Sequence, residues 1–106
     1  MTNPANGKTV YVAGGARGIG LGIVRALAAD GYDIVFSYRG SATDATQACK
    51  DLQAMYPEQS ISAIQIDLSE RGQVEQFAAQ IAATESLYGL VYNAGGSYDT
   101  LAALAD

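Results

Sequence analysis

The chain has 106 residues, of which 49% are hydrophobic and 16% charged, and this composition is typical of one compact globular domain. Its net charge of -5, without any basic run, disfavours binding to nucleic acid or to an acidic membrane surface. One cysteine and no histidine leave no Cys/His cluster for a metal, and without a leader-like or bilayer-spanning apolar run we expect a cytoplasmic protein.

Four short segments of strand type, three of them apolar runs and the third in the chain an alternation of apolar and polar residues, alternate with segments whose apolar residues recur at helical spacing. The strands are expected at residues 9–13, 33–38, 60–66 and 87–92. The first helix should end near Asp30-Gly31, because glycine suits a C-terminal cap. The second helix should occupy residues 42–56 and end before Pro57, because proline cannot continue a helix.

A third helix is expected between the last two strands, with Ser69 as its N-cap and Val74 and Phe77 on its apolar face. A further helix should begin within residues 99–106. Strict alternation, with strands that are apolar nearly throughout, predicts a parallel sheet covered on both faces. Right-handed crossovers favour the strand order 3-2-1-4. The predicted fold class over residues 1–106 is therefore α/β, a Rossmann-type doubly wound parallel sheet.

A glycine-rich turn joins the first expected strand to the first expected helix. It reads Gly14-Gly15-Ala16-Arg17-Gly18-Ile19-Gly20. The first glycine allows a sharp turn, the middle one lets backbone amides approach a pyrophosphate, and the last lets the helix pack close to the sheet. The helix N-terminus then directs free N–H groups and the positive end of its dipole toward the phosphates. The turn predicts a dinucleotide site that includes Gly14, Ala16, Gly18, Ile19 and Gly20.

The turn has two other interpretations, a nucleoside-triphosphate loop and an ordinary glycine-rich turn. No lysine followed by serine or threonine closes it, which excludes a nucleoside-triphosphate loop. An ordinary glycine-rich turn remains the alternative. It is disfavoured because the glycines stand after a strand and before a helix, at the start of the alternating pattern.

The end of the second expected strand predicts which dinucleotide is bound. Many NAD-binding folds place an acid about 20 residues beyond the glycine turn, where it binds the ribose 2′-hydroxyl. Residues 37–41 contain no carboxylate, but Arg39 follows Tyr38 there, and Arg17 can reach the same place from the turn. A guanidinium fork suits a phosphate, so Arg17, Tyr38 and Arg39 predict NADP(H) in preference to NAD(H). Two solvated surface arginines are the alternative. The missing acid also disfavours an S-adenosylmethionine methyltransferase.

Three segments resemble the short-chain dehydrogenase/reductase family, and the resemblance covers essentially the whole chain. They are Gly14-xxx-Gly18-Ile19-Gly20, with the family's glycine spacing, Asp67-Leu68 after the third strand, and Asn93-Ala94-Gly95 after the fourth. The resemblance implies that Asp67 contacts the adenine and that Leu68 belongs to the same site. It also implies that Asn93, Ala94 and Gly95 run beside the cofactor. A helix-capping turn is the alternative interpretation of Asp67.

The chain departs from the family pattern at several positions. Ala13 stands where the family usually has threonine, and Tyr92 where it often has asparagine. The family's catalytic serine and Tyr-xxx-Lys pair have no counterpart, since neither Lys8 nor Lys50 follows a tyrosine at that spacing. Tyrosines such as Tyr11 lie in expected strands and are interpreted as core or sheet residues. No catalytic residue is therefore assigned.

We expect the N-terminal, cofactor-binding part of an NADP(H)-dependent carbonyl reductase or alcohol dehydrogenase. The complete enzyme would transfer hydride between the nicotinamide and a small carbonyl or alcohol substrate. Its catalytic and substrate-binding part should lie beyond these residues, and it should be a homo-oligomer. The alternative is a dinucleotide-binding module without catalysis, such as a redox sensor or a scaffold. The fourth strand should be central in a complete sheet, so this chain alone should expose an apolar edge.

Overall fold

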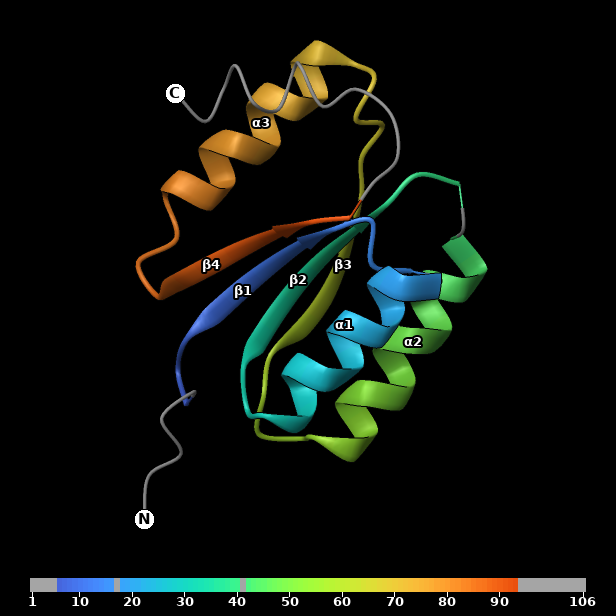
Figure 1. Ribbon diagram of the computed structural model, residues 1–106, viewed down its shortest axis with the longest axis vertical. Helices are drawn as coiled ribbons and strands as arrows, with labels where there is room; N and C mark the ends of the chain where they lie inside the picture. The colour runs from blue at the N-terminus through green and yellow to red at the C-terminus, as the bar shows by residue number, and fades with distance from the viewer. Residues whose placement is uncertain (1–5, 17, 41, 94–106) are drawn as a thin grey trace.

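A computed structural model of the protein describes residues 6–16, 18–40 and 42–93. Strands and helices alternate along these residues as β1 (Thr9–Ala13), α1 (Gly18–Ala29), β2 (Asp33–Tyr38), α2 (Ala42–Met55), β3 (Ile61–Gln65), α3 (Arg71–Ala82) and β4 (Leu87–Tyr92). The strands form one parallel sheet in the order β3-β2-β1-β4. Figure 1 shows α1 and α2 on one face of the sheet and α3 on the other. The predicted fold class and strand order are confirmed.

The predicted element bounds differ from the observed ones by about one residue, as expected where a ladder or helix frays at its ends. β3 lacks Ser60 and Ile66, although both still bond β2 through their backbones: the Ser60 carbonyl accepts from Ile34, and Ile66 donates to the Tyr38 carbonyl. α2 ends at Met55, one residue before the predicted end. The helix expected to begin within residues 99–106 lies outside the described residues.

The prediction of Ser69 as the N-cap of α3 is wrong. The N-cap is Glu70, whose side chain makes no capping hydrogen bond. The Ser69 hydroxyl instead donates to the Asp67 carboxylate at 2.6 Å. A carboxylate two residues upstream is a charged acceptor, and it competes successfully with the role of the hydroxyl as a helix cap.

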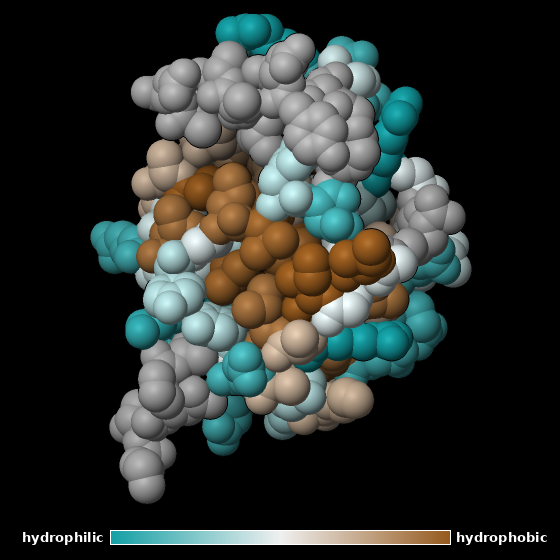
Figure 2. Space-filling model, in the orientation of Figure 1, coloured by the Kyte–Doolittle hydropathy of each residue, from teal (hydrophilic) through white to brown (hydrophobic). Residues whose placement is uncertain are grey.

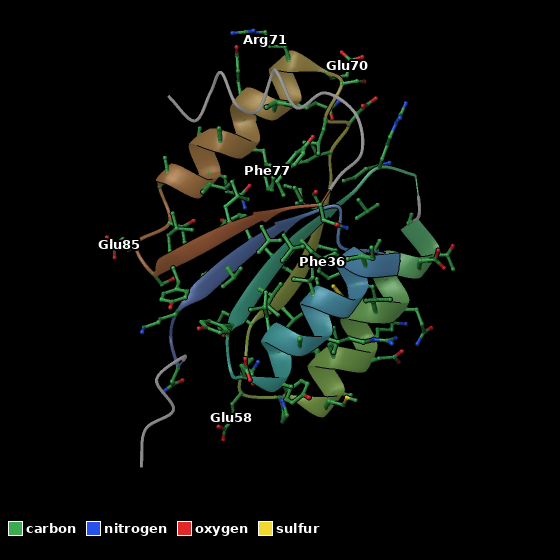
Figure 3. The ribbon with its side chains drawn as sticks, in the orientation of Figure 1. Phe36, Glu58, Glu70, Arg71, Phe77 and Glu85 are labelled. Carbon is green, nitrogen blue, oxygen red and sulfur yellow. The ribbon has the colours of Figure 1, made fainter. Side chains whose placement is uncertain are left out.

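Two apolar clusters hold the helices to the sheet. Val12, Val24 and Phe36 belong to the cluster under α1 and α2, while Tyr11 and Phe77 belong to the cluster under α3. Figure 3 labels Phe36 and Phe77 on opposite faces of the sheet. Successive residues of a strand point to opposite faces, so the central β1 is buried along its whole length. The prediction that Tyr11 is a core residue is confirmed.

β4 has only β1 as a neighbour among the described strands, and three of its large apolar side chains are exposed. Leu87, Tyr88 and Leu90 are 40%, 59% and 43% exposed. Figure 2 shows hydrophobic residues gathered across the middle of the molecule, between α3 and α1. No helix within the described ranges is long and apolar enough to cross a bilayer.

We expect the isolated 106-residue chain to self-associate through β4, because an apolar strand edge with unpaired backbone groups is a template for pairing. Leu90→Lys should weaken the association about tenfold or more, since burying one leucine contributes about 1.5–3 kcal/mol. Sedimentation velocity over a concentration series measures this. Met55→Lys, an exposed apolar site on α2, is the matched control. A monomer at high concentration, or equal effects of the two variants, would contradict the prediction.

Candidate cofactor-binding site

The carboxyl ends of the four parallel strands meet at one edge of the sheet. Gly14 follows β1, Arg39 follows β2, and Asn93 follows β4. Asp67 comes two residues after the end of β3. The chain proceeds outward from β1 to β2 and β3 and then returns to place β4 on the other side of β1. In open α/β sheets, ligands bind outside the carboxyl ends of the strands at such a reversal. The fold therefore brings the described residues of the predicted site to one edge.

The glycine turn has the conformations that its sequence predicts. Gly14 and Gly18 have φ angles of +86° and +59°, in the left-handed region that favours glycine. α1 begins at Gly18, where a side chain would meet open space. Ile19, the next residue, is 76% exposed although it is apolar, while Ala16 is buried. Arg17 lies outside the described residues. The start of α1 is thus accessible from solvent.

Gly20 is predicted to let the helix pack close to the sheet, but its closest contact is with the glycine turn. A Cβ on Gly20 would collide with the backbone carbonyl of Gly14 and lie 2.8 Å from the side-chain amide nitrogen of Asn93. The tight contact between turn and sheet falls instead at Gly15, where a Cβ would lie 2.6 Å from the Cβ of Phe36. The prediction did not include Gly15, although it is one of the four glycines in the run.

Residues from both neighbouring strands hold the turn. The backbone N–H groups of Gly14 and Gly15 donate to the hydroxyl and the carbonyl of Ser37, at 3.0 Å and 2.9 Å. On the other side, Asn93 donates from its backbone to the Ala13 carbonyl at 2.9 Å and from its side chain to the Gly14 carbonyl at 3.4 Å. The prediction did not include Ser37. Its signal in the sequence is a serine that follows the apolar run Ile34 to Phe36 in β2.

Arg39 and Asp67, predicted to hold different parts of a cofactor, face each other. The Arg39 Nε lies 3.7 Å from the Asp67 Oδ2, and their side chains are 77% and 29% exposed. The other oxygen, Oδ1, accepts from the Ser69 hydroxyl and from its backbone N–H at 2.9 Å. Asp67 thus stabilises the turn before α3 through Ser69 but does not cap the helix, whose N-cap is Glu70, and its Oδ2 lies on the side of Arg39.

Ser69 and Arg39 both stabilise the charged form of Asp67. The hydrogen bonds from the side chain and backbone of Ser69 are the larger causes that lower the pKa of this carboxyl, and the charge of Arg39 lowers it further. The carboxylate is therefore ionised at neutral pH. Within the described ranges, no three His, Cys, Asp or Glu side chains lie together as a metal site requires.

We expect the free energy of unfolding to fall as the pH decreases below about 4, the ordinary pKa of aspartate. Because the pKa of Asp67 is lower in the folded chain, the unfolded chain binds more protons in this window. Its contribution is complete above the unfolded pKa and is lost as the pH falls through the folded pKa. Chemical denaturation over a pH series should show a smaller fall in the free energy of unfolding for Ser69→Ala. Asp67→Asn should lack the part of this fall that Asp67 contributes. Identical pH profiles for all three proteins would contradict this prediction.

The family model of the short chain dehydrogenases matches residues 8–105, nearly the whole chain. The chain belongs to the short-chain dehydrogenase family. The match includes the glycine turn, the ends of all four strands and the segment after β4.

Two curated relatives of this short-chain dehydrogenase differ in what their names describe. The chain is 32% identical over 93 residues to a 3-oxoacyl-(acyl-carrier-protein) reductase of Aggregatibacter actinomycetemcomitans, covering 87% of this chain and 38% of the relative. It is 35% identical over 89 residues to a cyclic-di-GMP-binding biofilm dispersal mediator protein of Escherichia coli K12, covering 84% and 33%. The chain spans well under half the length of both relatives.

Solved structures share the fold over most of this short-chain dehydrogenase. A blue fluorescent protein from a metagenomic library, in complex with NADPH, is 42% identical with a TM-score of 0.76, covering 90% of this chain and 38% of that one. A short chain dehydrogenase from Burkholderia cenocepacia, in complex with NADP, is 36% identical with a TM-score of 0.77, covering 92% and 41%.

The described residues do not include every part of the predicted site. Tyr38 and Leu68 are half-buried and pack against the two apolar clusters, so their side chains support the edge rather than stand free in it. Ala94 and Gly95 lie outside the described residues, like Arg17.

Proposed function

We propose that this chain is the cofactor-binding part of an NADP(H)-dependent oxidoreductase acting on a small carbonyl or alcohol substrate. The observation that carries the proposal is the pairing of a glycine turn that opens α1 with an arginine, and no acid, at the end of β2. Two similar structures, 42% and 36% identical to this chain, are complexes with NADPH and NADP. Their cofactors support the choice of dinucleotide.

The residues present fit such a cofactor. The start of α1, where Gly18 and Ile19 are exposed, suits a pyrophosphate, and the space beside Gly18 leaves room for it. Arg39, 77% exposed, engages Asp67 through Nε and has its two terminal amino groups to offer a 2′-phosphate. Asp67 and Leu68 would contact the adenine, and Asn93 with Ala94 and Gly95 would run beside the cofactor. Arg17 and Tyr38 complete the proposed site.

When bound, the nicotinamide supplies the hydride chemistry, and the chain binds and orients it. The 106 residues contain no Tyr-xxx-Lys pair. We therefore propose that the proton donor belongs to a further part of the complete protein, which would also bind the substrate and form a homo-oligomer.

A turnover assay tests whether cofactor binding and proton transfer belong to different parts of the protein. The complete gene product should oxidise NADPH with members of a panel of ketones and aldehydes, whereas the purified 106-residue chain should not exceed the blank. Proton transfer requires a donor of suitable pKa at the reacting oxygen, and none is assigned in this chain. Turnover by the chain alone, free of host reductases, would contradict the proposal.

A binding protein without catalysis is the second candidate. The E. coli relative, 35% identical, is named for binding cyclic-di-GMP rather than for a reaction. Calorimetric titration of the complete protein with NADPH and with cyclic-di-GMP distinguishes the two. Binding of NADPH together with turnover supports the reductase. Binding of either ligand without turnover on any carbonyl substrate supports the second candidate.

A further inference from the structure

Ser37 is a polar residue in the interior whose function the predicted site leaves open. It is only 1% exposed, whereas the other fully buried side chains named with it, such as Phe36 and Ile34, are apolar. It occupies the last but one position of β2, two residues before Arg39. A buried hydroxyl is costly unless it is hydrogen-bonded, so its partner indicates what it does.

That partner is the glycine turn. The paired residues of β1 and β2 end at Val12 and Phe36, and beyond them the chain leaves the sheet at Gly14 with a φ of +86°. The Gly14 N–H donates to the Ser37 hydroxyl at 3.0 Å, and the Gly15 N–H donates to the Ser37 carbonyl at 2.9 Å. A side-chain oxygen thus serves as acceptor where the strand ladder can no longer supply one.

The position of Gly14 in turn determines the start of α1. Its carbonyl lies so close to Gly20 that a Cβ there would collide with it. Movement of Gly14 would therefore displace the first turn of α1, where Gly18 and Ile19 are exposed. The Ser37 hydroxyl accepts from the peptide that precedes Gly14, and the Ser37 carbonyl accepts from the peptide that follows it, through the Gly15 N–H.

We propose that Ser37 is a positioning residue for the phosphate-binding turn, acting through the Gly14 peptide on affinity for the dinucleotide. The inference rests on the proposed function. Since the turn would meet the pyrophosphate that NADP(H) and NAD(H) share, loss of the hydroxyl should weaken both equally. This differs from Arg39, which would meet only the 2′-phosphate.

The test uses Ser37→Ala in the complete protein. Without the acceptor, the Gly14 N–H must find water, and the turn must reorganise on binding. We expect affinity for NADP⁺ and for NAD⁺ to fall about tenfold each, with their ratio unchanged, because a buried donor without a partner is costly. Calorimetry on the folded protein measures both affinities. Residue-resolved amide hydrogen exchange should be faster at Gly14, whose N–H loses its acceptor, whereas the Gly15 N–H keeps the backbone carbonyl of residue 37.

Ile34→Val is the matched control, since Ile34 is fully buried in the same strand but lies away from the turn. It should lower stability while leaving both affinities and the Gly14 exchange rate unchanged. Equal affinities in Ser37→Ala and the unmutated protein would overturn the inference. If the unmutated protein binds neither dinucleotide, the proposed function fails, and Gly14 exchange alone decides: faster exchange in Ser37→Ala supports the positioning role, and an unchanged rate overturns it.

Discussion

Gly20→Ala is expected to lower the free energy of unfolding by about 3 kcal/mol and to abolish dinucleotide binding by the complete protein. The added Cβ would collide with the backbone carbonyl of Gly14, and a backbone atom cannot rotate away as the end of a side chain can. Relief requires the first turn of α1 to separate from the glycine turn. That separation removes the arrangement of N–H groups on which phosphate binding depends.

Gly22→Ala is the matched control for this substitution. Gly22 lies in the same helix, and a Cβ there would meet no atom within 4 Å. Alanine is the better helix former, so this variant should gain about 0.5–1 kcal/mol and bind both dinucleotides normally. Chemical denaturation followed by circular dichroism, with calorimetry for binding, measures both variants. Similar stabilities for the two would show that the approach of Gly20 to Gly14 is not tight.

The fold could be predicted because its signal is repeated in every element. Each strand carries an apolar run or an apolar alternation, and each helix has apolar residues at helical spacing, so the order of elements and the handedness of crossovers are sufficient to order the sheet. The N-cap of α3 was predicted wrongly because it depends on one local competition. The Ser69 hydroxyl could cap the helix or bond Asp67, and only the geometry shows that it bonds Asp67.

The site was predicted as a set of positions but not as a set of contacts. The pairing of Arg39 with Asp67 joins residues 28 apart in the chain, and it follows from the adjacency of β2 and β3 rather than from either motif. The contact of Ser37 with Gly14 was beyond prediction, because it depends on where one peptide leaves the sheet. The sequence patterns indicate which residue types are present at the site, whereas only the structure shows the direction of a single N–H group.

Arg39→Asp is expected to reverse the preference between the two dinucleotides. A guanidinium bonded to the 2′-phosphate contributes about 1.5–3 kcal/mol, so its loss should weaken NADP(H) about 10- to 100-fold. The new carboxylate should also accept from the 2′-hydroxyl of NAD(H) and strengthen its binding. Because this carboxylate would face Asp67, Arg39→Gln is needed as a companion. It removes the cation without introducing a second negative charge there.

Calorimetry on the complete protein at one fixed salt concentration measures both affinities for each variant, because screening weakens exposed charge pairs. Arg39→Gln should lose NADP(H) affinity without gaining NAD(H), which separates loss of the cation from gain of the acid. Lys50→Asp makes the same change of net charge on an exposed position of α2 and should leave the ratio unaltered. If the unmutated protein prefers NAD(H), or if Arg39→Asp and Lys50→Asp give the same ratio, Arg39 is a surface residue paired with Asp67 and the assignment to NADP(H) is wrong.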